Sequence, residues 1–247
     1  MNSYSSYSDD FYVNVQLNTE MELPSERETV LFFFEQLRRK FPSMKNFYNR
    51  ERNEYILEED KESGSYRWAT VEPRRIYSAC VNPGSIDDAL DQGAFIMDLV
   101  PHALSVTPLD CESLSFIMGF DYTYRGNHND LIAEALGNHP VFDRLPDLPG
   151  AKLLSNEPSI IFSLDDSCQT RCRIGIESRT TPYQLRTGEF SDDQLSVLIV
   201  VRHCGSLEGE QTYRSVLENL KQHCQAIVDQ FLIENVLQPV QEHIAIK

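Results

Sequence analysis

The chain has 247 residues and carries 38 acidic against 22 basic side chains, which gives a net charge of -16 at pH 7. A phosphate backbone or an anionic membrane surface would be repelled by this charge, so nucleic-acid and membrane partners are disfavoured and a basic protein partner is favoured. High negative charge also keeps a protein in solution without any partner, and the sequence leaves that simpler explanation open.

The cysteines and the N-terminal sequence indicate the cellular compartment of the protein. The six cysteines, at positions 80, 111, 168, 172, 204 and 224, are too sparse for a disulfide framework and suit a reducing environment. The first ten residues, MNSYSSYSDD, lack the basic and apolar segments of a signal peptide, and no apolar run is long enough to span a bilayer. We therefore expect a cytoplasmic protein.

In the first half of the chain, the residue pattern predicts one strand, a helix, three strands and a second helix. Residues 1–10 are expected to be a flexible tail, and from Phe11 to Asn18 apolar and polar side chains alternate as in a half-buried strand. Ser85 is placed to cap the second helix, which Pro101 ends or kinks. The elements between are a helix over 25–41, strands over 55–58, 66–71 and 76–81, and a helix over 86–100.

The second half repeats this order. Alternation predicts a strand over 114–120, and Asn127 is a good N-cap for a short helix that Gly137 stops. A proline-rich connection, HPVFDRLPDLPG, comes next, and the most amphipathic helix of the chain runs from Tyr213 to about Phe231. The three strands between them are predicted over 160–164, 173–179 and 195–202.

These elements predict an α+β fold made of two tandem β-α-β3-α halves. The halves are expected to span residues 11–110 and 111–247, the second ending in the long helix. An antiparallel sheet with its helices packed on one face would leave the other face open.

A family resemblance rests on this order of elements. It includes the Tyr-Ile-Leu strand at 55–57, Tyr-Arg-Trp at 66–68 and the closing helix. The order resembles the saddle-shaped doubled fold of the TATA-binding protein, and is similar to that of a sporadically distributed bacterial family of uncharacterised proteins. The resemblance implies a fold and no activity. DNA binding is not implied, because the strands lack basic clusters.

Two groups of residues are candidates for a chemical site. Cys168 and Cys172 are paired in sequence, and His203-Cys204 or His223-Cys224 offer further metal ligands. Adjacent residues point apart on a strand or a helix, so we predict core packing and no metal or other cofactor.

The second group is His128 with Asp121 and Asp130, which suggests acid–base chemistry. Because Asn127 and Asp130 favour a helix start, His128 is interpreted as an exposed first-turn residue. No catalytic residue is predicted.

Charged positions on the open sheet face are the candidate binding residues. Arg173, Glu177 and Arg179 alternate with the apolar Ile174 and Ile176. Arg202 is expected on a neighbouring strand, and Trp68 is a comparable position in the first half. The full set is Arg173, Glu177, Arg179, Arg202 and Trp68. They form either cross-strand ion pairs on a solvated sheet or a platform for a partner or an anionic ligand.

The function predicted first is that of a non-catalytic acidic binding protein. It would act through protein–protein contact, as an inhibitor or immunity-like protein that masks a basic surface does. The alternative is a small-molecule-binding protein or enzyme with its cavity between the sheet and the long helix. The sequence leaves the oligomeric state open.

Overall fold

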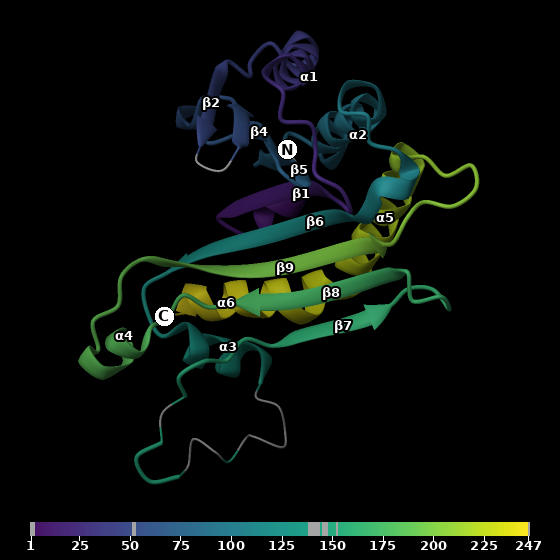
Figure 1. The fold of residues 1–247 in the computed structure, drawn as a ribbon. Helices are drawn as coiled ribbons and strands as arrows, with labels where there is room; N and C mark the ends of the chain where they lie inside the picture. Colours follow the sequence, from purple (N-terminus) through teal and green to yellow (C-terminus); the bar gives the residue numbers. More distant parts are fainter. Residues whose placement is uncertain (1–2, 51–52, 138–143, 145–147, 152, 247) are drawn as a thin grey trace.

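A single antiparallel sheet of nine strands forms the frame of the molecule, with helices packed against it (Figure 1). The computed structural model describes residues 3–50, 53–137, 144, 148–151 and 153–246. The predicted α+β class and the antiparallel pairing are confirmed. No helix in these described ranges is both long and apolar enough to cross a membrane.

The first half contains one strand more than predicted. Its elements are β1 (Asp10–Thr19), α1 (Arg27–Lys40), β2 (Asn46–Arg50), β3 (Glu54–Glu58), β4 (Tyr66–Glu72), β5 (Arg75–Val81) and α2 (Ile86–Ala103). The prediction of three strands between the helices was wrong because β2 was missed. Four of its five side chains are exposed, so it lacks the alternation that marks a half-buried strand.

The second half follows the predicted order and adds a short helix. Its elements are β6 (Cys111–Tyr124), α3 (His128–Leu136), β7 (Ser159–Ser163), β8 (Thr170–Glu177), α4 (Pro182–Thr187), β9 (Asp193–Cys204) and α5 (Tyr213–Ile227). A π-helical segment, Val228–Leu237, and α6 (Gln238–Ile246) continue the last helix beyond its predicted end. Most of the proline-rich connection lies outside the described residues.

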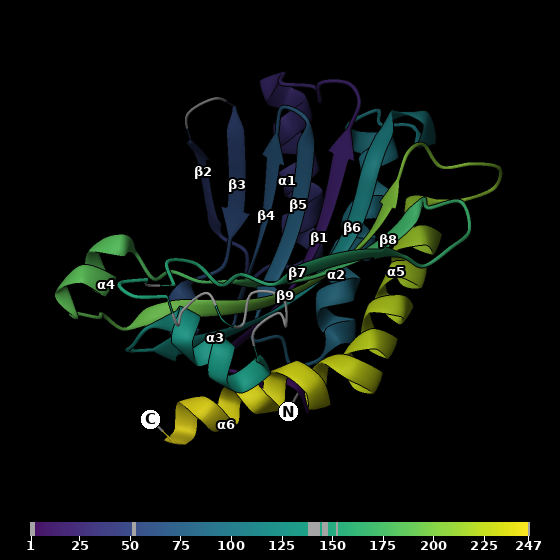
Figure 2. The ribbon, with the colours of Figure 1, turned by 90° about the horizontal axis from the view of Figure 1, so that it is seen from below.

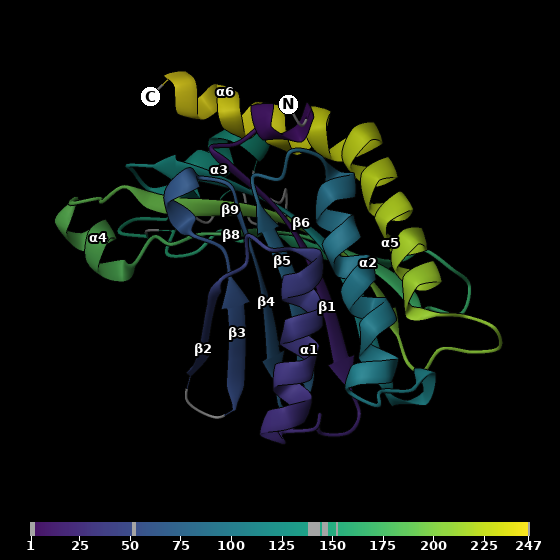
Figure 3. The ribbon, with the colours of Figure 1, turned by 90° about the horizontal axis from the view of Figure 1, so that it is seen from above.

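The strands are ordered β2-β3-β4-β5-β1-β6-β9-β8-β7, so β1 and β6 join the two halves at the centre. Strands β2 to β5 run steeply across β7 and β8 in Figure 2, as the accumulated twist of a large sheet requires. Helices α1 and α2 cover one face of the sheet in Figure 3. Gly93 of α2 lies against both Val15 of β1 and Leu217 of α5, which places α5 on the same face. The internal duplication stays a prediction.

The core lies between that face and the helices. In β1 the predicted inward residues, Phe11, Val13, Val15 and Leu17, are all buried. The predicted stripe of the last helix is buried from Tyr213 to Cys224 and again at Val228. Phe231 is exposed, because the buried face of the π-helical segment continues to Leu232 and Val236 instead.

Residues 3–10 are not the loose tail that was expected. Ser3–Ser6 form a 3-10 turn in which Tyr4 is buried, with its ring 5.8 Å from that of Phe11. The Tyr4 hydroxyl donates a hydrogen bond of 2.6 Å to Oδ1 of Asp229. A buried aromatic ring with a paired hydroxyl therefore anchors the start of the chain to its C-terminal helix.

A candidate binding groove on the open sheet face

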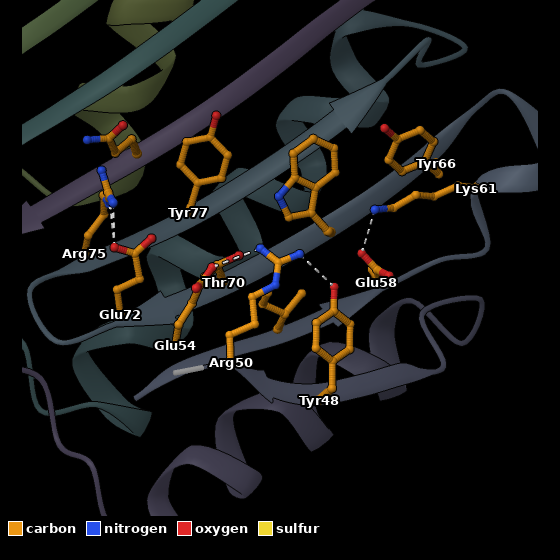
Figure 4. A pocket seen from close by; sticks show the side chains of 13 residues that line it. Tyr48, Arg50, Glu54, Glu58, Lys61, Tyr66, Thr70, Glu72, Arg75 and Tyr77 are labelled. Carbon is orange, nitrogen blue, oxygen red and sulfur yellow. Dashed lines mark hydrogen bonds and ion pairs between the residues drawn. The ribbon is translucent and has the colours of Figure 1, made fainter. Parts of the chain in front are cut away.

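A groove of about 470 Å³ lies on the sheet face opposite the helices, across β1 to β5 (Figure 4). It combines aromatic, acidic and basic side chains, and its described lining contains no cysteine, histidine or serine. The lining residues are Gln16, Tyr48, Arg50, Glu54, Ile56, Glu58, Lys61, Tyr66, Trp68, Thr70, Glu72, Arg75 and Tyr77.

Strand register explains why these residues meet. Opposite residues in an antiparallel pair project from the same face and lie within contact distance. One row across the strands runs Tyr48, Ile56, Thr70, Tyr77 and Gln16, and the rows beside it place Glu58 next to Trp68, Arg50 next to Glu54 and Glu72 next to Arg75. Side chains from five strands therefore converge on one surface.

Aromatic rings form much of this surface. The ring of Trp68 lies between those of Tyr66, stacked at 5.5 Å, and Tyr77, at 6.3 Å between centroids. The amide Nδ2 of Asn14 donates to the Tyr77 hydroxyl at 2.5 Å. Burial raises the pKa of Tyr77 to about 12, so its hydroxyl stays protonated at neutral pH. Tyr77 therefore adds no charge to the groove.

Three ion pairs surround the rings. Their nitrogen–oxygen distances are 3.5 Å for Arg50–Glu54, 3.3 Å for Lys61–Glu58 and 2.5 Å for Arg75–Glu72. The carboxylate side chains are 28%, 15% and 27% exposed, and their basic partners 56%, 55% and 45%. The acids therefore lie deeper in the groove than the bases.

Two of these bases also cover aromatic rings. Nζ of Lys61 lies 5.6 Å from the ring centre of Tyr66, and the guanidinium carbon of Arg50 lies 5.6 Å from that of Tyr48. Cations are attracted to the faces of aromatic rings, most strongly to tryptophan. The groove thus already binds positive charge, supplied by its own chain.

Of the five predicted binding residues, only Trp68 lines this groove. Arg173 and Glu177 form an ion pair of 3.8 Å on β8. Arg173 shares a cross-strand row with Trp68, but Ala79, Asn14, Ile117 and Val200 lie between them. Five strand spacings separate the two, about 24 Å along the sheet. The predicted set does not form one site.

The other two predicted residues have local roles. Arg202 lies on β9, which pairs with β8 as predicted, and its Nε donates to Oγ of Ser115 at 2.8 Å. The strand predicted over 173–179 was displaced toward the C-terminus, because β8 begins at Thr170 and ends at Glu177. Arg179 follows the strand, and its backbone N–H donates to Nδ1 of His128 at 3.3 Å.

Sequence reasoning missed most of the groove. Tyr48 and Arg50 belong to the strand that was not predicted, and Tyr77 joins the groove only through the pairing of β4 with β5. The available signal was the alternation of Tyr66 and Trp68, two large aromatic residues on one face of a strand.

His128 is buried, so its interpretation as an exposed first-turn residue was wrong. Its Nδ1 accepts from Arg179, and its Nε2 lies 3.3 Å from the carbonyl oxygen of Tyr124. Both contacts fit a neutral ring with its proton on Nε2, and burial lowers its pKa. The Asn127 side chain caps α3 as predicted. His128 therefore joins α3 to the segment after β8.

Asp121 lies on β6 and makes different hydrogen bonds from His128. Its Oδ2 accepts from Nε2 of Gln194 at 2.6 Å, and burial raises the pKa of its carboxyl group. Of the cysteines considered as metal ligands, Cys172 and Cys224 are buried, as core packing predicts, but Cys168 is exposed, so that prediction was wrong for Cys168. In the part of the chain that is described, no three His, Cys, Asp or Glu side chains are grouped to hold a metal.

The layer between the sheet and α5 is filled by side chains. Leu217, Leu220 and Cys224 of α5 are buried, as are Met118 and Val201 on the strands that α5 contacts. The alternative function needs a cavity in this layer, whereas the groove lies on the opposite face of the sheet.

No family model matches the chain, and no curated protein matches it. The class that the fold and the groove define is an α+β protein with a nine-stranded antiparallel sheet and an aromatic, charge-paired groove on one face.

Proposed function

We propose that this is a non-catalytic binding protein whose groove takes up a basic segment of a protein partner. The observation that carries this proposal is the joint placement of aromatic rings and carboxylates in one groove, with the carboxylates less exposed than the bases that pair with them. Such a surface suits lysine or arginine side chains, whose stems pack on rings while their charged ends reach acids.

The composition of the groove supports a protein partner. Tryptophan, tyrosine and arginine are the residue types that most often dominate the energy of protein–protein contacts. Here one tryptophan, three tyrosines and two arginines line a single groove. With a net charge of -16, the chain also attracts basic partners at long range.

A partner's cation would replace one that the groove already holds. Lys61 and Arg50 are more than half exposed, and an exposed ion pair contributes only about 0 to 1 kcal/mol. Displacing either base into solvent therefore costs little, while the partner's side chain gains the same ring and carboxylate. The chain's own bases keep the acids paired until a partner arrives.

A charge-matched pair of variants tests the proposal. A short arginine-rich peptide is the probe, and its affinity is measured by calorimetry at about 0.05 M and about 0.5 M salt. The groove variant, E54Q/E58Q/E72Q, is expected to bind the peptide at least tenfold more weakly than the wild type. The control variant, E208Q/E210Q/E242Q, removes the same charge from exposed positions outside the described groove lining and is expected to bind nearly as well as the wild type.

Two results would contradict the proposal. Equal weakening in the two variants would mean that net charge alone attracts the peptide. A protein partner recovered from the native host that is acidic, and whose binding does not respond to salt, would exclude a basic-partner function.

A further inference from the structure

The edge strand β7 is exposed along its whole length. It ends the sheet on the side away from β2, and none of its five residues is buried (Figure 1). Ile160 is 60% exposed, Ile161 64% and Phe162 37%. Three consecutive large apolar side chains on an open edge mark a surface that another strand can cover.

The opposite edge of the sheet differs. Strand β2 carries Arg50 and follows Lys45, and charged residues on an edge discourage pairing with another chain. Strand β7 has the sequence Ser-Ile-Ile-Phe-Ser and no charge. Charged residues therefore protect the β2 edge from pairing with another chain, but not the β7 edge.

Hydrogen bonds to β8 fix which backbone groups of β7 face outward. Ile176 donates to the carbonyl of Pro158 at 3.0 Å, and Leu164 donates to that of Thr170 at 2.8 Å. Because bonded residues alternate along an antiparallel pair, the even-numbered residues between them face β8. The N–H and C=O groups of Ser159, Ile161 and Ser163 point away from the sheet.

We propose that a second copy of this chain pairs with β7 in antiparallel orientation, about a two-fold axis at Ile161. In this register Ile161 faces Ile161 of the second copy, and Ser159 faces its Ser163. All three outward residues are then paired, which forms about six backbone hydrogen bonds. On the other face of the strand, Ile160 meets Phe162 of the second copy.

The symmetry of β7 selects a second copy as the occupant. The strand is uncharged and matches itself under a two-fold axis, so it adds no repulsion of its own to that between two chains of net charge -16. At its ends the register brings Glu157 level with Asp165 of the second copy. Both carboxylates bond within their own chain, to Ser178 and to Thr170 respectively. Added salt should therefore strengthen this contact, whereas it should weaken binding of a basic partner in the groove.

Charge exchange at Ile161 tests the register. The mass of the full chain is measured by light scattering after size-exclusion chromatography, over a wide range of protein concentration and at low and high salt. The wild type is expected to dimerise, and more completely at high salt. I161K and I161E, which place like charges opposite each other, are each expected to be monomers, and an equal mixture of the two should recover the dimer. L109K, which alters a side chain that is 77% exposed elsewhere, should dimerise like the wild type.

Three results would overturn the proposal. These are a monomeric wild type at every concentration and salt, an I161K variant that dimerises as the wild type does, and a mixture of I161K and I161E that stays monomeric. Circular dichroism of each variant shows whether it is folded. The proposal does not depend on the function of the groove, because I161K should bind the arginine-rich peptide as the wild type does.

Discussion

Replacing Gly119 by alanine should destabilise the protein because of a single neighbour, Tyr12. The two residues face each other across β1 and β6, and the Tyr12 side chain lies over the glycine. A Cβ atom at position 119 would be 2.0 Å from Cζ of Tyr12 and 2.4 Å from its two Cε atoms. No side chain fits there unless the ring moves.

The size and sign of the effect follow from this contact. Adding a methyl group to a well-packed site costs about 1–3 kcal/mol. Removing a glycine from the interior of a strand returns about 0.5–1 kcal/mol. The net loss in free energy of unfolding for G119A should therefore lie between about 0 and 2.5 kcal/mol, with a central value of about 1 kcal/mol. In a Y12A background the obstacle is absent, so the same substitution should stabilise the protein by about 0.5–1 kcal/mol.

Urea unfolding of the wild type, G119A, Y12A and the double variant measures this change of sign. G175A is a matched control, because Gly175 is also a strand glycine on the open face and its nearest neighbour is the flexible end of Arg173, at 3.2 Å. It should be close to neutral. If G119A has the same effect with and without the Tyr12 ring, the proposed packing of Tyr12 over Gly119 is wrong.

Three further predictions concern buried polar groups. Burial lowers the pKa of His128, so as the pH falls below about 6.5 the unfolded chain takes up a proton before the folded protein does. The free energy of unfolding should therefore decrease in this pH range. In an H128N variant, unfolding titrations should no longer show this decrease. Burial raises the pKa of Asp121, so the free energy of unfolding should decrease as the pH rises above about 3.8. The D121N variant should lack this decrease and be more stable than the wild type at pH 7. A D121N variant that is less stable than the wild type at pH 7 would refute the raised pKa of Asp121. Y4F removes the hydroxyl that bonds Asp229 and should reduce the free energy of unfolding by about 0.5–1.5 kcal/mol, whereas no change would mean that this contact does not anchor the N-terminus.

The sequence predicted the elements whose burial alternates. In β1 every second residue is inward and apolar, and in α5 the apolar stripe recurs at helical spacing, so both were placed correctly. Strand β2 was missed because its side chains are exposed and only its pairing with β3 makes it a strand. Helix α4 has just six residues, and its signal was a single capping box between Thr181 and Gln184.

The candidate site was harder to predict, because a site on a sheet depends on register. Trp68 was recognised as a candidate residue. Whether it lies beside Tyr77 or beside Arg173 depends on the order of the strands in the sheet, and the alternation of residues along a single strand gives no information about that order. Arg173 and Arg202 were correctly expected on neighbouring strands, since those strands are close in sequence. The distance of Arg173 from Trp68 follows from the four strands between β4 and β8, which only the complete sheet reveals.

The most direct test of the central claim uses the only tryptophan in the chain, Trp68, which lies in the groove between Tyr66 and Tyr77. Its fluorescence is recorded while an arginine-rich peptide is added at low salt, with a glutamate-rich peptide of equal length as the control. We expect a saturable change with the basic peptide, which is lost at high salt and in the E54Q/E58Q/E72Q variant, and no change with the acidic peptide. Peptide binding that calorimetry detects but that leaves Trp68 fluorescence unchanged would contradict the claim, because the basic segment would then be bound outside the groove.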